Sequence, residues 1–169
     1  MKRCLVIAVA MLFVSLQMSA QKVGYINTEK ILSVIPEYKS AQIQLENLSK
    51  QYSQKIESEY AKIETMYQTY QQQKGSLSAQ VRAQRENEIL SREQNVKELQ
   101  KTYFGQDGLM QKKSEELLNP LKERVDAAIK KIAENGNFMI IFDTSIMQGI
   151  AYAKESDDLS GLVIRALGY

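Results

Sequence analysis

The chain has 169 residues, with 22 lysine and arginine side chains against 20 aspartate and glutamate side chains, and it contains no histidine. This near-neutral balance disfavours nucleic-acid binding, which usually requires a strongly basic face. The absence of histidine removes the commonest general base and metal ligand.

Residues 1–20 predict a secretory signal peptide. Lys2 and Arg3 form a basic start, residues 4–14 form an apolar run too short to span a membrane, and small residues lead to Ala20. We expect cleavage near Ala20 and export to the periplasm. Removal of Lys2 and Arg3 lowers the basic count from 22 to 20, equal to the acidic count, and removal of Cys4 leaves no cysteine. Disulfide and thiolate chemistry are therefore not expected in the mature chain.

The first predicted element after the signal peptide is a short strand. Residues 22–27 alternate between apolar and polar side chains, as a half-buried strand does. Thr28 is expected to cap a short helix that ends near Val34. Pro36 suits the first turn of the next helix, where its missing amide hydrogen costs nothing.

Residues 36–119 predict an antiparallel coiled-coil arm. On both limbs, apolar and tyrosine side chains recur every three or four residues, which is the spacing of one helix face. If Gly75-Ser76 is the turn, Tyr52 faces Leu99 and Tyr70 faces Val81. The two stripes then match along the whole hairpin.

Several positions are expected to weaken this arm. Residues 67–73 near the tip have little aliphatic content, so we expect the distal third to be the least stable part. Gly105 and Gly108 each cost about 1 kcal/mol relative to alanine in a helix. The simpler interpretation is a continuous helix with two weak positions, and the alternative is a hinge. Asn119-Pro120 is expected to bend the return limb where it leaves the arm.

The C-terminal residues complete a small body. We expect a helix over 121–133 that ends at Asn135-Gly136, strands over 138–142 and 149–153, and a final helix capped near Ser156. The predicted fold is therefore α+β: a β-rich body from residues 21–35 and 120–169, with the helical-hairpin arm of residues 36–119 inserted between its two parts. So small a core usually requires oligomerisation.

No pattern in the sequence indicates an enzyme, a metal site or a bound cofactor. Phosphate-binding glycine loops, nucleophile elbows and histidine or cysteine clusters are missing. Adjacent acids such as Glu115-Glu116 and Asp157-Asp158 are typical of solvated helix surfaces and caps. Calcium binding at Asp157-Asp158 would lack the further oxygen ligands that it needs.

The tip of the arm is the candidate contact surface. Tyr67 and Tyr70 either pack in the seam or present partly exposed rings to a partner. Lys74, Arg82 and Arg85 are either a solvated end or an attraction for acidic segments and lipid headgroups. Transient contact with a membrane surface is expected on the second interpretation.

The chain resembles the Skp/OmpH family of periplasmic chaperones. The resemblance lies in the opening strand Lys22–Asn27, the long charged hairpin and the closing segments around Phe138–Asp143, Ile150–Ala153 and Asp157-Asp158-Leu159. It implies a homotrimer with a β-rich trimerisation body and three helical arms around a cavity. Such proteins hold unfolded outer-membrane proteins without ATP.

Together with this function, the sequence predicts roles for two sets of residues. The residues expected to bind clients are Tyr60, Tyr67, Tyr70, Leu77 and Val81. Those expected in the trimer core are Val23, Tyr25, Ile140, Phe142 and Ile150. The alternative function is a structural coiled-coil tether or spacer of the cell envelope, for which a continuous heptad seam would be expected.

Overall fold

The computed structural model describes residues 22–169, so the predicted signal peptide lies outside the described residues. The described chain divides into two compact units. Residues 22–34 and 125–169 form the unit that we call the body, and residues 35–124 form the unit that we call the arm. Each unit is described by itself. Most of the chain is helical, and the sheet is small.

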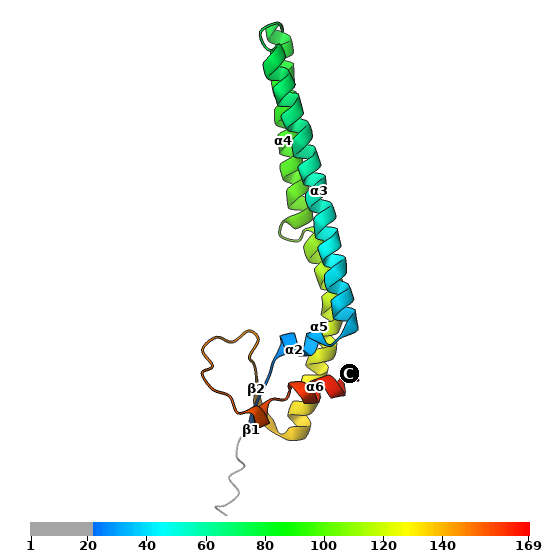
Figure 1. Cartoon of the computed structure of the whole chain (residues 1–169), viewed down its shortest axis with the longest axis vertical. Coiled ribbons are helices and arrows are strands. Elements are labelled where there is room, and N and C mark those ends of the chain that lie inside the picture. The colour runs from blue at the N-terminus through cyan, green and yellow to red at the C-terminus, as the bar shows by residue number, and fades with distance from the viewer. Residues whose placement is uncertain (1–21) are drawn as a thin grey trace, which may run out of the picture. The chain divides into compact units, whose positions relative to one another are not determined.

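The body contains a two-stranded parallel sheet, β1 (Lys22–Ile26) and β2 (Phe138–Asp143). Val23 pairs with Ile140 and Tyr25 with Phe142, after an irregularity that leaves Met139 without a partner on β1. The helices of the body are α2 (Thr28–Ser33), the 3₁₀ helix η1 (Glu155–Asp157), α6 (Ser160–Ala166) and the C-terminal end of α5 (Leu109–Gly136) (Figure 1).

One face of this sheet is covered by the short helices. Gly24 and Ile26 are buried, as are Ile31 of α2 and Val163 of α6. A Cβ atom at Gly24 would lie 2.6 Å from the Leu159 Cδ1 atom. Glycine is therefore required here by close packing, because any side chain would displace Leu159.

Two capping predictions for the body are wrong. The N-cap of α2 is Asn27, whose Oδ1 atom accepts the Lys30 N–H at 2.8 Å, and not Thr28. Thr28 instead donates its own backbone N–H to Asp143 Oδ1. At α6, η1 intervenes after Ser156, and Asp158 accepts the N–H of Ser160 at 2.8 Å. Both helix starts thus use a local side-chain acceptor that lies two or three residues before the donor amide.

The predicted strand over residues 149–153 is also wrong. These residues have no regular structure. Tyr152 within the segment is 83% exposed, and Ile146 just before it is 80% exposed. β2 pairs only with β1 among the described strands, so its other edge is open, but residues 149–153 do not pair with it. Their alternating side chains therefore remain uncovered.

The arm is an antiparallel hairpin. Its outgoing limb is α3 (Pro36–Gln73), 38 residues without interruption, and α4 (Ala79–Phe104) returns beside it (Figure 1). Pro36 occupies the first turn of α3, and Ser78 caps α4 by accepting the N–H of Val81. The core of the hairpin is made by the buried residues Ile56, Ile63, Tyr70, Ile89 and Val96.

The register of the hairpin differs from the prediction by about one helical turn. Tyr52 stacks on Tyr103, with ring centroids 4.0 Å apart, and the Tyr70 hydroxyl donates to Glu86 rather than facing Val81. One cause is the loop, which occupies residues 74–78 and so moves the centre of the turn past Gly75. A second cause is that helical side chains lean toward the N-terminus of their own helix, which shifts each contact further along both limbs.

The return limb is not one continuous helix. α4 ends at Phe104 and α5 begins at Leu109, so the simpler interpretation of Gly105 and Gly108 as weak helical positions is wrong. By contrast, Pro120 lies inside α5, which continues to Gly136, and the expected separate helix over 121–133 does not begin there.

Candidate functional site

The uncovered side of the body sheet is apolar. Val23, Ile140 and Phe142 are 45%, 41% and 38% exposed, although they are large apolar side chains in paired strands. In a sheet, side chains two apart share a face, so Val23 and Tyr25 lie on the side opposite Gly24 and Ile26. The sheet therefore has one packed face and one open face.

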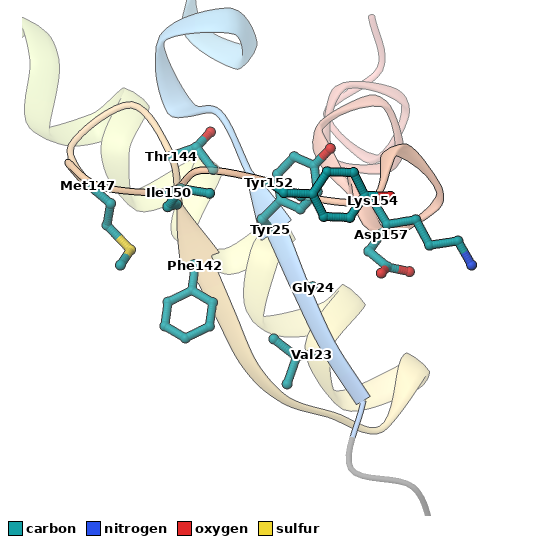
Figure 2. Close-up of a pocket in the computed structure, with 11 residues that line it drawn as sticks. Val23, Gly24, Tyr25, Phe142, Thr144, Met147, Ile150, Tyr152, Lys154 and Asp157 are labelled. Carbon is teal, nitrogen blue, oxygen red and sulfur yellow. The ribbon is translucent and has the colours of Figure 1, made fainter.

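The loop after β2 extends this open side. An open cavity of about 440 Å³ is lined by Val23, Tyr25 and Phe142 from the strands and by Met147, Ile150 and Tyr152 from the loop (Figure 2). We call the following set the body face: Val23, Tyr25, Ile140, Phe142, Met147, Ile150 and Tyr152. It contains all five residues that the sequence predicted for an oligomer core. Met147 and Tyr152 were missed, and their signal was an alternating apolar segment without a partner.

Tyr25 is held neutral at the edge of this face. Burial raises the pKa of the Tyr25 phenol, and the carboxylates of Asp158, Glu155 and Asp157 raise it further, while Lys30 opposes them. A phenolate beside three carboxylates is unfavourable. A phenol with the ordinary tyrosine pKa of about 10 is already neutral at physiological pH, and the raised pKa of Tyr25 extends this neutral range further.

Two aspartates join the N-terminal and C-terminal parts of the body behind this face. Asp143 accepts hydrogen bonds from the Thr28 N–H at 3.1 Å and from both the N–H and hydroxyl of Ser145. Asp158 accepts the Ser160 N–H and forms an ion pair with Lys30 at 3.3 Å. Burial alone would raise the pKa of each carboxyl, but these bonds outweigh it and lower both pKa values.

A buried hydroxyl completes the connection. Ser160 is fully buried, and its Oγ atom accepts the backbone N–H of Asn27 at 2.9 Å. This role of Ser160 could not be predicted from the sequence, because serine at a helix start usually caps its own helix.

The five residues predicted to bind clients do not form one surface on the arm. Tyr60 and Tyr67 are 42% and 48% exposed, whereas Tyr70 is 5% exposed. Tyr70 and Leu77 share a groove of about 280 Å³, which we call the tip groove and whose other apolar lining is Met66 and Ile89. Val81 is half-buried.

The tip is basic although the chain is nearly neutral. Residues 65–85 include Lys74, Arg82 and Arg85 but no aspartate or glutamate. The Lys74 ammonium lies 5.6 Å from the centre of the Tyr70 ring, within range of a cation–π contact. Hydrogen bonding to Glu86, burial and the Glu86 charge raise the pKa of Tyr70, while Arg82 opposes them. Tyr70 is thus a neutral donor held inside the hairpin.

The described residues contain no group of side chains suited to a metal ion. Within residues 22–169, none of the helices combines the length and apolar character that crossing a bilayer requires. The described residues do offer apolar surface, above all the body face and the partly exposed rings of Tyr60 and Tyr67 on the arm.

A long helical hairpin inserted between the two parts of a small strand-and-helix body defines a class of hairpin-armed proteins. Comparison with known proteins agrees. The family model described as Outer membrane protein (OmpH-like) matches residues 22–167, and the chain belongs to this family. Its members are chaperones and not enzymes.

Two relatives extend the comparison. The chain is 24% identical over 151 residues to the Chaperone protein Skp of Yersinia enterocolitica, covering 89% of this chain and 88% of that protein. An OmpH-like structure from Caulobacter crescentus superposes with a TM-score of 0.65 at 10% identity, covering 88% of this chain and 85% of that one. At that identity, the structural likeness concerns the fold alone.

Proposed function

We propose that this protein is a homotrimeric periplasmic holdase that binds unfolded outer-membrane proteins, without ATP, in a cavity between its helical arms. The observation that supports the proposal most is the body face, a set of large apolar side chains that paired strands and the following loop leave exposed around one open cavity. Its family membership supports the chaperone role.

Assembly would complete the core of the body. Side chains such as Val23, Ile140 and Phe142 are already more than half buried. Complete burial would therefore stabilise each by roughly 1 kcal/mol, since full burial of such a side chain is worth about 1.5–3 kcal/mol. Summed over several copies, this gain favours a closed oligomer in which each body covers its neighbour.

Client binding would rely on many weak contacts. Tyr60 and Tyr67 each offer a partly exposed ring with a polar edge. Several arms held on one body raise the effective concentration of such contacts, so a client is retained while each contact exchanges. A tether, by comparison, needs a continuous seam, and the break at residues 105–108 interrupts it.

The proposal is tested with the chain lacking residues 1–20. Native mass measurement should give three copies, and with an unfolded outer-membrane β-barrel protein it should give a complex that keeps the client soluble equally well with and without ATP. A monomer at micromolar concentration that leaves the client to aggregate would contradict the proposal.

The contribution of the arm surface has a separate test. Tyr60→Ser combined with Tyr67→Ser should release clients about threefold faster, because each contact is weak and several remain. Gln71→Ser, an exposed substitution on the same helix, is the control and should leave release unchanged. Equal release rates for all three proteins would remove these tyrosines from the client surface.

A further inference from the structure

The tip groove is an apolar hollow with well-packed walls. Tyr70 and Ile89, which are 5% and 9% exposed, belong to the buried core of the hairpin, and Met66 and Leu77 pack against that core. Leu77 is the only residue between 71 and 80 that is not exposed. The distal third of the arm, which the sequence predicts to be the least stable part, thus contains much of the buried packing of the hairpin. The groove is therefore formed before anything binds in it.

The charge around this groove is mainly positive. Residues 65–85 contain three basic side chains and no acidic one. Arg85 lines the groove, and the Lys74 ammonium lies 5.6 Å from the centre of the Tyr70 ring, which lines it too. Glu86 follows directly, but its carboxylate accepts the Tyr70 hydroxyl. An anion seated against the groove would consequently meet cationic groups.

Arg85 is able to turn toward such an anion at little cost. Its guanidinium contacts Glu88 Oε2 at 3.4 Å, and its side chain is 56% exposed. Exposed ion pairs of this kind contribute little to stability. Arg92 lies 3.6 Å from Glu88 Oε1, so Glu88 keeps a cationic partner when Arg85 moves away. A guanidinium that is released in this way can bind a carboxylate through two parallel hydrogen bonds.

The α3 wall of the groove supplies hydrogen-bond acceptors. The hydroxyls of Thr65 and Thr69 donate to the backbone carbonyls of Ala61 and Thr65 at 2.9 and 2.8 Å. Each hydroxyl oxygen can still accept a hydrogen bond, and Gln73 adds an amide oxygen. A peptide has backbone N–H groups to donate to these atoms, whereas the acyl chain of a lipid has none. The wall therefore favours a peptide over a lipid.

The size of the groove limits how much of a peptide enters it. Its volume of about 280 Å³ lies just below the range of small-molecule pockets, about 300–1,000 Å³, so it takes one residue. Within a chain, an apolar residue carries no carboxylate of its own. Only at the carboxyl terminus does one residue combine an apolar side chain, an N–H group and a negative charge.

We infer that the tip groove binds the carboxyl-terminal residue of a peptide chain when that residue is aromatic or aliphatic. The side chain of this residue lies against Tyr70, Leu77 and Ile89. Its carboxylate pairs with Arg85, and Lys74 adds positive charge nearby.

The consequence for clients rests on the proposed function. An unfolded client whose chain ends in an apolar residue is held at that end by the tip groove, while the weaker contacts with Tyr60 and Tyr67 hold the rest. Clients that end in a polar residue lack this contact and are released sooner.

The inference is tested first with peptides on the chain lacking residues 1–20. A fluorescent peptide of polar residues that ends in phenylalanine with a free carboxylate should bind and should shift the methyl signal of Met66, which Met66→Leu identifies. The same peptide with a carboxamide end should bind about tenfold more weakly, because it lacks the charge-assisted hydrogen bonds. A peptide that ends in serine should lose a similar factor. Equal binding of the acid and the amide would overturn the inference.

Two arginine variants locate the carboxylate. Arg85→Gln should weaken the free-acid peptide about tenfold, to the level of the amide. Arg92→Gln is the matched control, because Arg92 pairs with the same Glu88 but lines a different groove of the hairpin, and it should leave binding unchanged. Equal affinities for the two variants would overturn the assignment of Arg85. If either variant fails to fold, the peptide series on the unmodified chain still decides.

Lipid and client measurements separate the remaining outcomes. Phosphatidylglycerol vesicles should not displace the fluorescent peptide, and displacement at an equal concentration of anion would overturn the inference in favour of a lipid. Peptide binding by a chain that keeps no unfolded outer-membrane protein soluble would refute the proposed function and leave the groove. Normal client holding without peptide binding would refute the groove alone.

Discussion

The arm and the body differ in where their contacts come from along the chain. In the arm, buried side chains recur on two neighbouring helices, and each short stretch repeats the same packing. In the body, the decisive contacts join distant segments, as in the hydrogen bond from Thr28 to Asp143, 115 residues away. The arm can therefore tolerate a local defect such as its break, whereas the body depends on a few contacts that nothing else duplicates.

The largest effect that we expect comes from the body face. Ile140→Asp combined with Phe142→Asp would place two unpaired charges where neighbouring copies are proposed to meet, which costs several kcal/mol. Sedimentation should show loss of the assembled species. Leu90→Asp, at an apolar arm residue that is 53% exposed, is the control and should assemble normally. An intact oligomer for the double variant would exclude β2 from the interface.

The packed side of the same sheet should be the next most sensitive place. Gly24→Ala forces a Cβ atom to within 2.6 Å of Leu159 and 3.2 Å of Phe138. Overpacking of this kind costs about 1–3 kcal/mol, and thermal unfolding should report it. Gly161→Ala, whose Cβ comes no nearer than 3.6 Å to the flexible Arg165 side chain, should be neutral or stabilising. Equal melting temperatures for both variants would contradict the close approach at Gly24.

In the arm, a double-mutant cycle distinguishes the observed register from the predicted one. Tyr52→Ala with Tyr103→Ala should show a coupling of about 0.5–1.5 kcal/mol, the range for stacked aromatic pairs. Tyr52→Ala with Leu99→Ala should be close to additive. Urea unfolding of the four proteins in each cycle provides the measurement, and a larger coupling to Leu99 would restore the predicted register.

The smallest expected effect is the pH dependence of the body. The pKa values of Asp143 and Asp158 are lowered on folding, so their contribution is fully present above the unfolded pKa of about 4 and is lost as the pH falls through the folded values. Asp143→Asn with Asp158→Asn should therefore flatten the fall in unfolding free energy below about pH 4. Asp126→Asn, outside this network, is the control. An unchanged acid slope in the double variant would show that other carboxyls set it.

The sequence was sufficient for the parts of the fold that repeat. The apolar stripes of α3 and α4 follow from helical spacing, and the sheet pairs Val23 with Ile140, two residues that the sequence predicted for the oligomer core. The predicted register of α3 against α4 was wrong because register depends on loop length and on the direction of side chains. The spacing of apolar residues along a helix contains neither. Asn27 was missed as a cap because Asp143, far along the chain, occupies the amide of Thr28. Residues 149–153 have strand-like alternation, yet they do not pair with the open edge of β2.

The parallel pairing of β1 with β2 also governs the order in which the molecule can form. Residues 27–137 lie between the two strands, so the first strand emerges during synthesis long before its partner exists. The hairpin, with its local contacts, can fold in the interval and bring its two ends together, as the 3.1 Å ion pair between Glu37 and Arg124 indicates. A chain truncated before Phe138 would keep the helical hairpin but would leave β1 without its partner strand, so its body would stay unfolded.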